Sequence, residues 1–104
     1  MRARDALELA TVGSAACLGR TNELGVIAPG AAADLAVWPL DGPQFAGAHS
    51  DPVEALLRCG PISARHTIVN GKFVVRDDSI VARGLDDMLR RHKHISRAWQ
   101  AIAA

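Results

Sequence analysis

The chain has 104 residues, of which 49% are hydrophobic but only 4% aromatic, and its formal net charge is +1. A chain of this length buries roughly two thirds of its unfolded surface, so any core is small and must be built from Ala, Val, Leu and Ile. The charge balance excludes a general attraction to nucleic acid or anionic membranes. No apolar run approaches the ~20 residues of a membrane span, and the basic start leads into a charged helix instead of a signal-peptide core. We therefore expect a cytoplasmic protein with no nucleic-acid or membrane partner.

The two cysteines lie far apart and in no paired motif. We expect Cys17 and Cys59 to be reduced and buried, with a disulfide between them as the alternative. Cys59 precedes Gly60-Pro61 near the end of a predicted helix and has no base beside it. Thiolate chemistry needs a cation or a helix N-terminus to lower the thiol pKa, so a packing role is expected for Cys59.

A helix with small side chains is predicted near the start of the chain. Asp5 followed by Glu8 resembles a capping box, apolar residues continue to Leu18, and Gly19 is a natural stop. Such a helix is a poor core element for a small domain, but it can lie very close to a larger surface. Its small residues are Ala10, Gly13, Ser14, Ala15 and Ala16.

About five short β-strands are expected in the centre of the chain. Residues 23–28 (ELGVIA) end at Pro29-Gly30, a pair that suits a type II turn with Gly30 at positive φ. Residues 34–38 (DLAVW) predict a buried strand entered from a polar residue. The prolines at 39 and 43 cannot continue this strand, so a loop is expected to about residue 50.

A short helix and a hairpin are predicted next. Asp51 at the N-cap, Pro52 at the first position and Glu54 open a helix that ends near residue 59. Residues 66–69 and 72–75 flank the dipeptide Asn-Gly, the strongest short-range signal of a β-hairpin. Two aspartates at 77 and 78 turn the chain into a last strand at residues 79–82.

The final helix is predicted from about Leu85. Acidic residues open it and basic ones follow, as the helix dipole prefers. Its apolar side chains fall on one stripe, formed by Met88, His92, Ile95, Trp99 and Ile102.

These elements have no obvious way to close a barrel, so the sheet is expected to keep unpaired edges. A complete protein normally pairs or covers such edges. We therefore expect that further strands and a packing surface lie outside this chain.

Four segments resemble, in the same order, the region that follows the barrel in the amidohydrolase superfamily. Gly25 would allow close approach there, Gly30 would make a turn, and Asp34 precedes a strand. The segments are residues 23–30 (ELGVIAPG), 33–38 (ADLAVW), 48–53 (AHSDPV) and 69–75 (VNGKFVV).

Residues 45–49 (FAGAH), 51–53 (DPV) and 59–61 (CGP) are most similar to the branch of 8-oxoguanine deaminase, hydroxyatrazine hydrolase and cytosine-guanine deaminases. The resemblance implies a (β/α)₈ barrel with a His-x-His pair, two further histidines and an aspartate around zinc or iron. Such a metal would activate a water to attack the ring carbon that bears the amino group. All these ligands would lie upstream of Arg4, so no metal is assigned to this chain.

Several residues invite a functional interpretation. His92 and His94 form a His-x-His pair, but on a helix residues two apart point about 200° apart and cannot share an ion. His49 and Asp51 lie in a loop that could approach an active-site mouth or a neighbouring subunit. The simpler interpretation is a local hydrogen bond for His49 and a helix cap for Asp51. His66 is expected to be a strand residue half in solvent.

The basic residues of the last helix suggest nucleic acid at first sight. They lack interleaved aromatics and are offset by two aspartates, so a solvated helix face is expected instead. The cluster consists of Arg90, Arg91, Lys93 and Arg97.

The predicted fold class is an α+β fragment: a partial composite β-sandwich of a metal-dependent hydrolase, a barrel-packing N-terminal helix and a C-terminal helix. Residues 1–20 would pack on the barrel, residues 21–84 would form the partial sandwich, and residues 85–104 would form a helix that clamps them. The parent enzyme would deaminate or dechlorinate a nitrogen heterocycle such as an oxidised purine or a triazine. The chain itself would have no catalytic, substrate-binding or metal-binding residue.

The expected partner is the remainder of the parent chain, and association with further copies is left open. The alternative is a self-standing, non-catalytic module that associates through its open strand edges and the stripe around Trp99. The two hypotheses differ in completeness, because a self-standing module would be a compact monomer with its strand edges covered.

Overall fold

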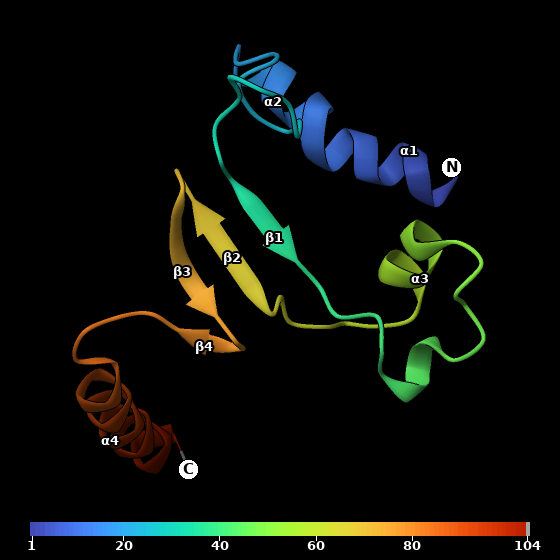
Figure 1. Ribbon diagram of the computed structural model, residues 1–104. Helices are drawn as coiled ribbons and strands as arrows, with labels where there is room; N and C mark the ends of the chain where they lie inside the picture. Colours follow the sequence, from blue (N-terminus) through green and yellow to red (C-terminus); the bar gives the residue numbers. More distant parts are fainter. Residues whose placement is uncertain (104) are drawn as a thin grey trace.

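The computed structural model describes residues 1–103, which form a small antiparallel sheet with helices at both ends (Figure 1). The sheet has four strands in the order β1-β2-β3-β4, namely β1 (Leu35–Val37), β2 (His66–Val69), β3 (Lys72–Arg76) and β4 (Ser79–Ile80). The helical elements are α1 (Ala3–Glu8), a π-helical segment η1 (Leu9–Gly13), α2 (Ser14–Cys17), a 3₁₀ turn η2 (Pro43–Phe45), α3 (Pro52–Arg58) and α4 (Leu85–Ala103).

The first helix begins earlier than predicted. It starts at Ala3, two residues before Asp5, because the Asp5 carboxylate reaches back to accept the Arg2 amide at 2.8 Å and pairs with the Arg2 guanidinium at 3.0 Å. The sequence predicted one continuous α-helix, whereas the structure has a π-helical segment between α1 and α2. Within that segment the Thr11 hydroxyl donates to the Leu7 carbonyl at 2.7 Å.

Residues 23–28 form no strand, so the expectation of five strands was wrong by one. Gly25 has a φ of +75°, which turns the chain out of an extended path. A Cβ at Gly25 would lie 2.6 Å from the Thr11 carbonyl carbon and oxygen, so this loop passes directly over the π-helical segment. The close approach predicted for Gly25 is confirmed. The turn at Pro29-Gly30 is confirmed too, with Gly30 at φ +85° and the Ala31 amide donating to the Ala28 carbonyl at 3.1 Å.

The predicted hairpin joins β2 and β3. Asn70 and Gly71 have φ values of 48° and 76°, as a type I′ turn requires. The turn is also tied to the entry of β1, because the Asn70 amide donates to Asp34 Oδ1 at 2.7 Å and the Gly71 amide donates to the Ala33 carbonyl at 3.0 Å. Asp34 therefore anchors the hairpin, a contact that the sequence pattern did not reveal.

Few side chains are buried within the described residues. The buried hydrophobic residues are Ala3, Ala15, Phe45 and Ala55. The prediction that residues 34–38 form a buried strand was wrong, because Val37 is 46% and Trp38 38% exposed. Among the described residues, only Leu35 of β1 is half-buried, and it shares a hollow with Leu7 and Thr11 of the first helical region.

Both faces of the sheet carry exposed apolar side chains. Leu35 pairs with Ile68 and Ile68 with Phe73, so by strand alternation Phe73 shares one face with Val37. Val69 follows Ile68 and lies on the opposite face. Ile80 lies on that face too, because it pairs with Val75, and a β-bulge brings Val75 opposite Thr67. Large apolar residues are thus exposed on both faces.

The C-terminal helix α4 stands apart from the other elements (Figure 1). Its predicted start at Leu85 is confirmed. Its apolar stripe is exposed, with Trp99 at 71% and Ile102 at 83%, so among residues 1–103 α4 does not clamp the other elements as predicted.

The chain is much more open than an independent domain of the same length. Its radius of gyration is 18.0 Å, whereas a compact domain of this length has about 13 Å. Its accessible surface is 8293 Å², whereas a folded monomer of 11.0 kDa exposes about 5,600 Å². The surplus is about 2,700 Å², and exposed aliphatic and aromatic residues occur on the first helix, the sheet and α4.

Gly25→Ala should destabilise the chain more than Gly19→Ala. Both glycines have positive φ, +75° and +69°, but a Cβ at Gly19 meets nothing within 4 Å. The left-handed conformation should cost roughly 1–2 kcal/mol at either site, and the overlap with Thr11 should add roughly 1–3 kcal/mol at Gly25 alone. Thermal unfolding followed by circular dichroism measures the difference. Equal losses in both variants would contradict the close contact.

Candidate functional site

The helices α1 and α3, which lie near each other in Figure 1, meet in a joint near their N-terminal ends. Ala3 and Ala55 are buried at this joint, and their small side chains let the helices approach closely. The Glu54 carboxylate accepts the Ala3 amide at 3.4 Å, and the Arg4 guanidinium donates to Asp51 at 3.1 Å. The joint therefore links two segments about fifty residues apart by both packing and charge.

Asp51 is the polar centre of the joint. It caps α3 as predicted, with Oδ1 accepting the Val53 amide at 3.0 Å and the Glu54 amide at 3.4 Å. Partial desolvation would raise the pKa of Asp51, but the two amides and the Arg4 guanidinium outweigh it and hold this pKa below its ordinary value. Asp51 is thus an ionised structural residue, and every contact of its carboxylate is used by α1 or α3.

His49 lies nearby but does not join this group. Its side chain is exposed, and no hydrogen bond of its ring is present among residues 1–103, so the local hydrogen bond predicted for it is not observed. His66 begins β2 and is half-buried, as predicted. Its ring packs edge-on against Phe73 with the centroids 5.8 Å apart.

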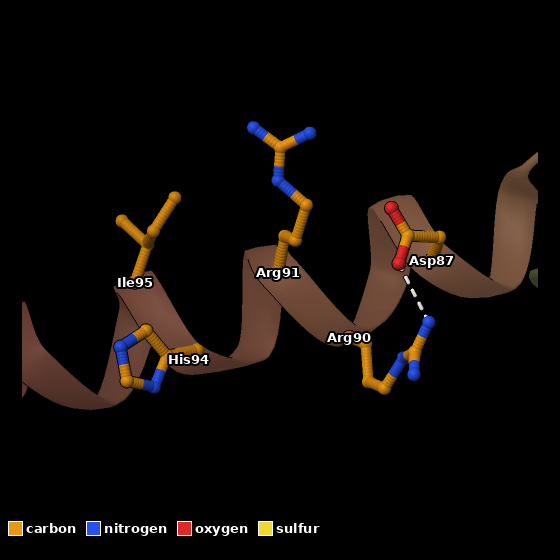
Figure 2. Close-up of a pocket in the computed structure, with 5 residues that line it drawn as sticks. All are labelled: Asp87, Arg90, Arg91, His94 and Ile95. Carbon is orange, nitrogen blue, oxygen red and sulfur yellow. Dashed lines mark hydrogen bonds and ion pairs between the residues drawn. The ribbon is translucent and has the colours of Figure 1, made fainter.

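His92 and His94 both lie on α4 and line different hollows of the helix surface. One hollow is lined by Asp87, Arg90, Arg91, His94 and Ile95 (Figure 2). In Figure 2 the Arg90 side chain turns back to Asp87, 2.6 Å away, while Arg91 and Ile95 project from another side of the helix. All five residues come from one exposed helix, so the hollow has no opposing wall and holds no converging polar groups.

The cysteines do not form a site. Both are free thiols, Cys59 half-buried at the end of α3 and Cys17 exposed, so the expected burial of Cys17 was wrong. Cys17 ends α2 two residues after Ala15, which places it on the opposite side of the helix from the buried alanine. Within the described part of the chain, no three His, Cys, Asp or Glu side chains come together in a group that could hold a metal ion. No helix among these residues is long and apolar enough to cross a membrane.

Residues 1–74 match the sequence model of the Amidohydrolase family. The chain belongs to the amidohydrolase family. It is 41% identical over 93 residues to an 8-oxoguanine deaminase of Pseudomonas aeruginosa, which covers 89% of this chain and 20% of that protein. It is 36% identical over 97 residues to a hydroxydechloroatrazine ethylaminohydrolase of Pseudomonas sp., which covers 84% of this chain and 20% of the relative. The chain therefore spans about one fifth of the length of these relatives.

Solved structures agree with this assignment. A triazine hydrolase variant matches with a TM-score of 0.79 and 39% identity, over 90% of this chain and 20% of the other. An atrazine chlorohydrolase of Arthrobacter aurescens, complexed with zinc, matches with a TM-score of 0.78 and 40% identity, over 88% and 20% of the two chains. The resemblance inferred from the sequence motifs is thus confirmed at the level of the family.

The joint between α1 and α3 was not foreseen from the sequence. The cap at Asp51 was recognised from the Asp-Pro pair, but nothing in the local pattern indicated that Arg4 would meet it. The only available signal was the small size of Ala3 and Ala55, and small residues have many other uses.

Asp51→Ala should open the joint more than Asp51→Asn. Asparagine is also a good N-cap and retains the bonds to α3, whereas it loses the charge that attracts Arg4. Because the pKa of Asp51 is lowered in the folded chain, its carboxylate contributes stability above the ordinary range near pH 3.9, and the contribution is lost as the pH falls through the lowered value.

Thermal unfolding measured between pH 3 and pH 7 tests this. The acid loss of stability should be smaller in Asp51→Asn, while Asp51→Ala should be less stable throughout the range. Asp86→Asn in the first turn of α4 is the control for a general change of charge. Unchanged stability in Asp51→Ala would count against the joint.

Proposed function

We propose that this chain is the structural C-terminal part of a metal-dependent hydrolase that deaminates or dechlorinates a nitrogen heterocycle. The observation that carries the proposal is the similarity of nearly the whole chain to one fifth of an 8-oxoguanine deaminase. A 5-methylthioadenosine/S-adenosylhomocysteine deaminase of Halobacterium salinarum is similar too, at 35% identity over 101 residues. An oxidised purine or a triazine is the substrate class that the relatives favour.

The catalytic metal, zinc or iron, would be held outside this chain. When bound, it would supply an activated water for attack on the ring carbon. The residues described here do not fit such a site, because their histidines are dispersed over a loop, a strand and two sides of α4. We therefore assign no catalytic step to any residue of this chain.

The role left to the chain is to complete and support a larger fold. β1 and β4 are the outer strands of the sheet, and each offers unpaired backbone groups along one edge. We infer that strands from elsewhere in the parent protein pair with these edges and cover the sheet as a composite β-sandwich. Residues 1–20 would pack on the barrel and residues 21–84 would form this half of the sandwich, followed by the C-terminal helix.

The size of the exposed surface supports an extensive partner. A typical stable interface covers about 800 Å² on each side, whereas the surplus here is about 2,700 Å². The exposed apolar residues also lie on several sides: on the first helix, on both sheet faces and on α4. One contact with a second copy covers one patch, so the remainder of the parent chain is the better partner.

A self-standing association module is the competing proposal, and scattering by the isolated chain separates the two. If the chain depends on a larger fold, small-angle X-ray scattering should give a radius of gyration near 18.0 Å or larger, or particles of aggregated chains. A complete module should give a stable monomer with a radius of gyration near 13 Å. The compact monomer would overturn the proposal.

A chimera provides the functional test. In the Pseudomonas aeruginosa 8-oxoguanine deaminase, the matching 93-residue segment is replaced by this chain. The chimera should remain soluble and deaminate 8-oxoguanine, because the replaced part supports the fold and the enzyme's own barrel carries the chemistry.

The intact enzyme and a version truncated before the segment are the controls. The truncated enzyme should be insoluble or inactive, since its apolar surfaces lose their cover. A truncated enzyme with full activity would show that the segment is dispensable. A folded chimera that binds metal but lacks activity would show that the segment contributes to catalysis.

A further inference from the structure

The turn between β3 and β4 has an unfavourable backbone. Asp77 and Asp78 have φ values of 48° and 64°, both in the left-handed region and neither a glycine. A residue with a side chain adopts this region at a cost, although aspartate tolerates it better than most. Such a turn persists because neighbouring groups hold it.

Two hydrogen bonds from the turn to the start of β2 provide this support. The Asp78 amide donates to the Arg65 carbonyl at 3.0 Å. The Asp77 amide donates to Nδ1 of His66 at 3.2 Å. A ring nitrogen accepts a hydrogen bond only when it carries no proton, so this second bond needs the neutral imidazole with its proton on Nε2.

The surroundings of His66 hold the ring in place without replacing this bond. Phe73 packs against the ring edge-on, and the Arg76 guanidinium lies 4.9 Å above the Phe73 ring. Arg65 lies 3.8 Å from Asp78 and 3.7 Å from Asp41, so its charge is already partnered.

Asp77 could attract a protonated ring, since its carboxylate lies 3.8 Å from Nε2. That carboxylate is 80% exposed, however, and exposed ion pairs contribute little. The positive charge of Arg76 on the adjacent strand β3 disfavours a second positive charge on the His66 ring.

We propose that His66 is a proton-sensitive latch for the β3–β4 turn: protonation of Nδ1 breaks the bond from the Asp77 amide and loosens the outer strand β4. β4 pairs with Val75 and Arg76, and just beyond it the Val81 amide donates to the Val74 carbonyl at 2.9 Å. Among the described residues no strand pairs with its other side. A looser turn therefore changes the edge that a further strand would use.

Hydrogen exchange of the Asp77 amide, followed by NMR in the full chain between pH 5.5 and pH 7.5, tests the latch. The protection factor is used, because it removes the pH dependence of intrinsic exchange. In the unmodified chain it should fall roughly three- to tenfold as the pH is lowered, the loss expected from one hydrogen bond.

Two variants make the test specific. His66→Asn offers a side-chain oxygen that accepts but does not titrate, so its protection should stay high and flat. His66→Leu offers no acceptor, so its protection should be low and flat. A pH-independent protection factor in the unmodified chain would overturn the proposal, as would a pH dependence that persists in His66→Asn.

Discussion

The shortage of buried apolar surface governs the whole structure. Within the described residues, three of the four buried hydrophobic residues are alanines and Phe45 is the only large one. Burial of apolar area is the main favourable term in folding, and its effect grows with the area removed from water. An open sheet with large exposed apolar residues on both faces lacks most of this favourable free energy of burial. This shortage of buried apolar area is the physical basis of our proposal that the chain is one part of a larger fold.

What the chain builds for itself is a set of local joints. Asp51 and Arg4 connect α1 to α3, Asp34 connects the β2–β3 hairpin to β1, and Gly25 lets a loop lie on the π-helical segment. Each joint fixes the path of the backbone without needing a large core. These joints fix the positions of the first helix, the sheet and the loop, and all three keep apolar side chains exposed.

Membership of the amidohydrolase family offers an explanation for these exposed apolar surfaces. The relatives are about five times longer than the part they share with this chain. The shared part contains turns, strand entries and helix ends, and in residues 1–103 no three possible metal ligands come together.

Features that depend on neighbouring residues in the chain could be predicted before the structure was known. The cap at Asp51, the Asn-Gly hairpin, the Pro-Gly turn and the start of α4 were all predicted, because a few adjacent residues set their backbone angles. Burial, by contrast, depends on what lies opposite a side chain. Only the tertiary structure could show that Val37 and Trp38 are exposed, that Arg4 meets Asp51, and that the π-helical segment accommodates Gly25, because segments distant in the sequence decide each of these contacts.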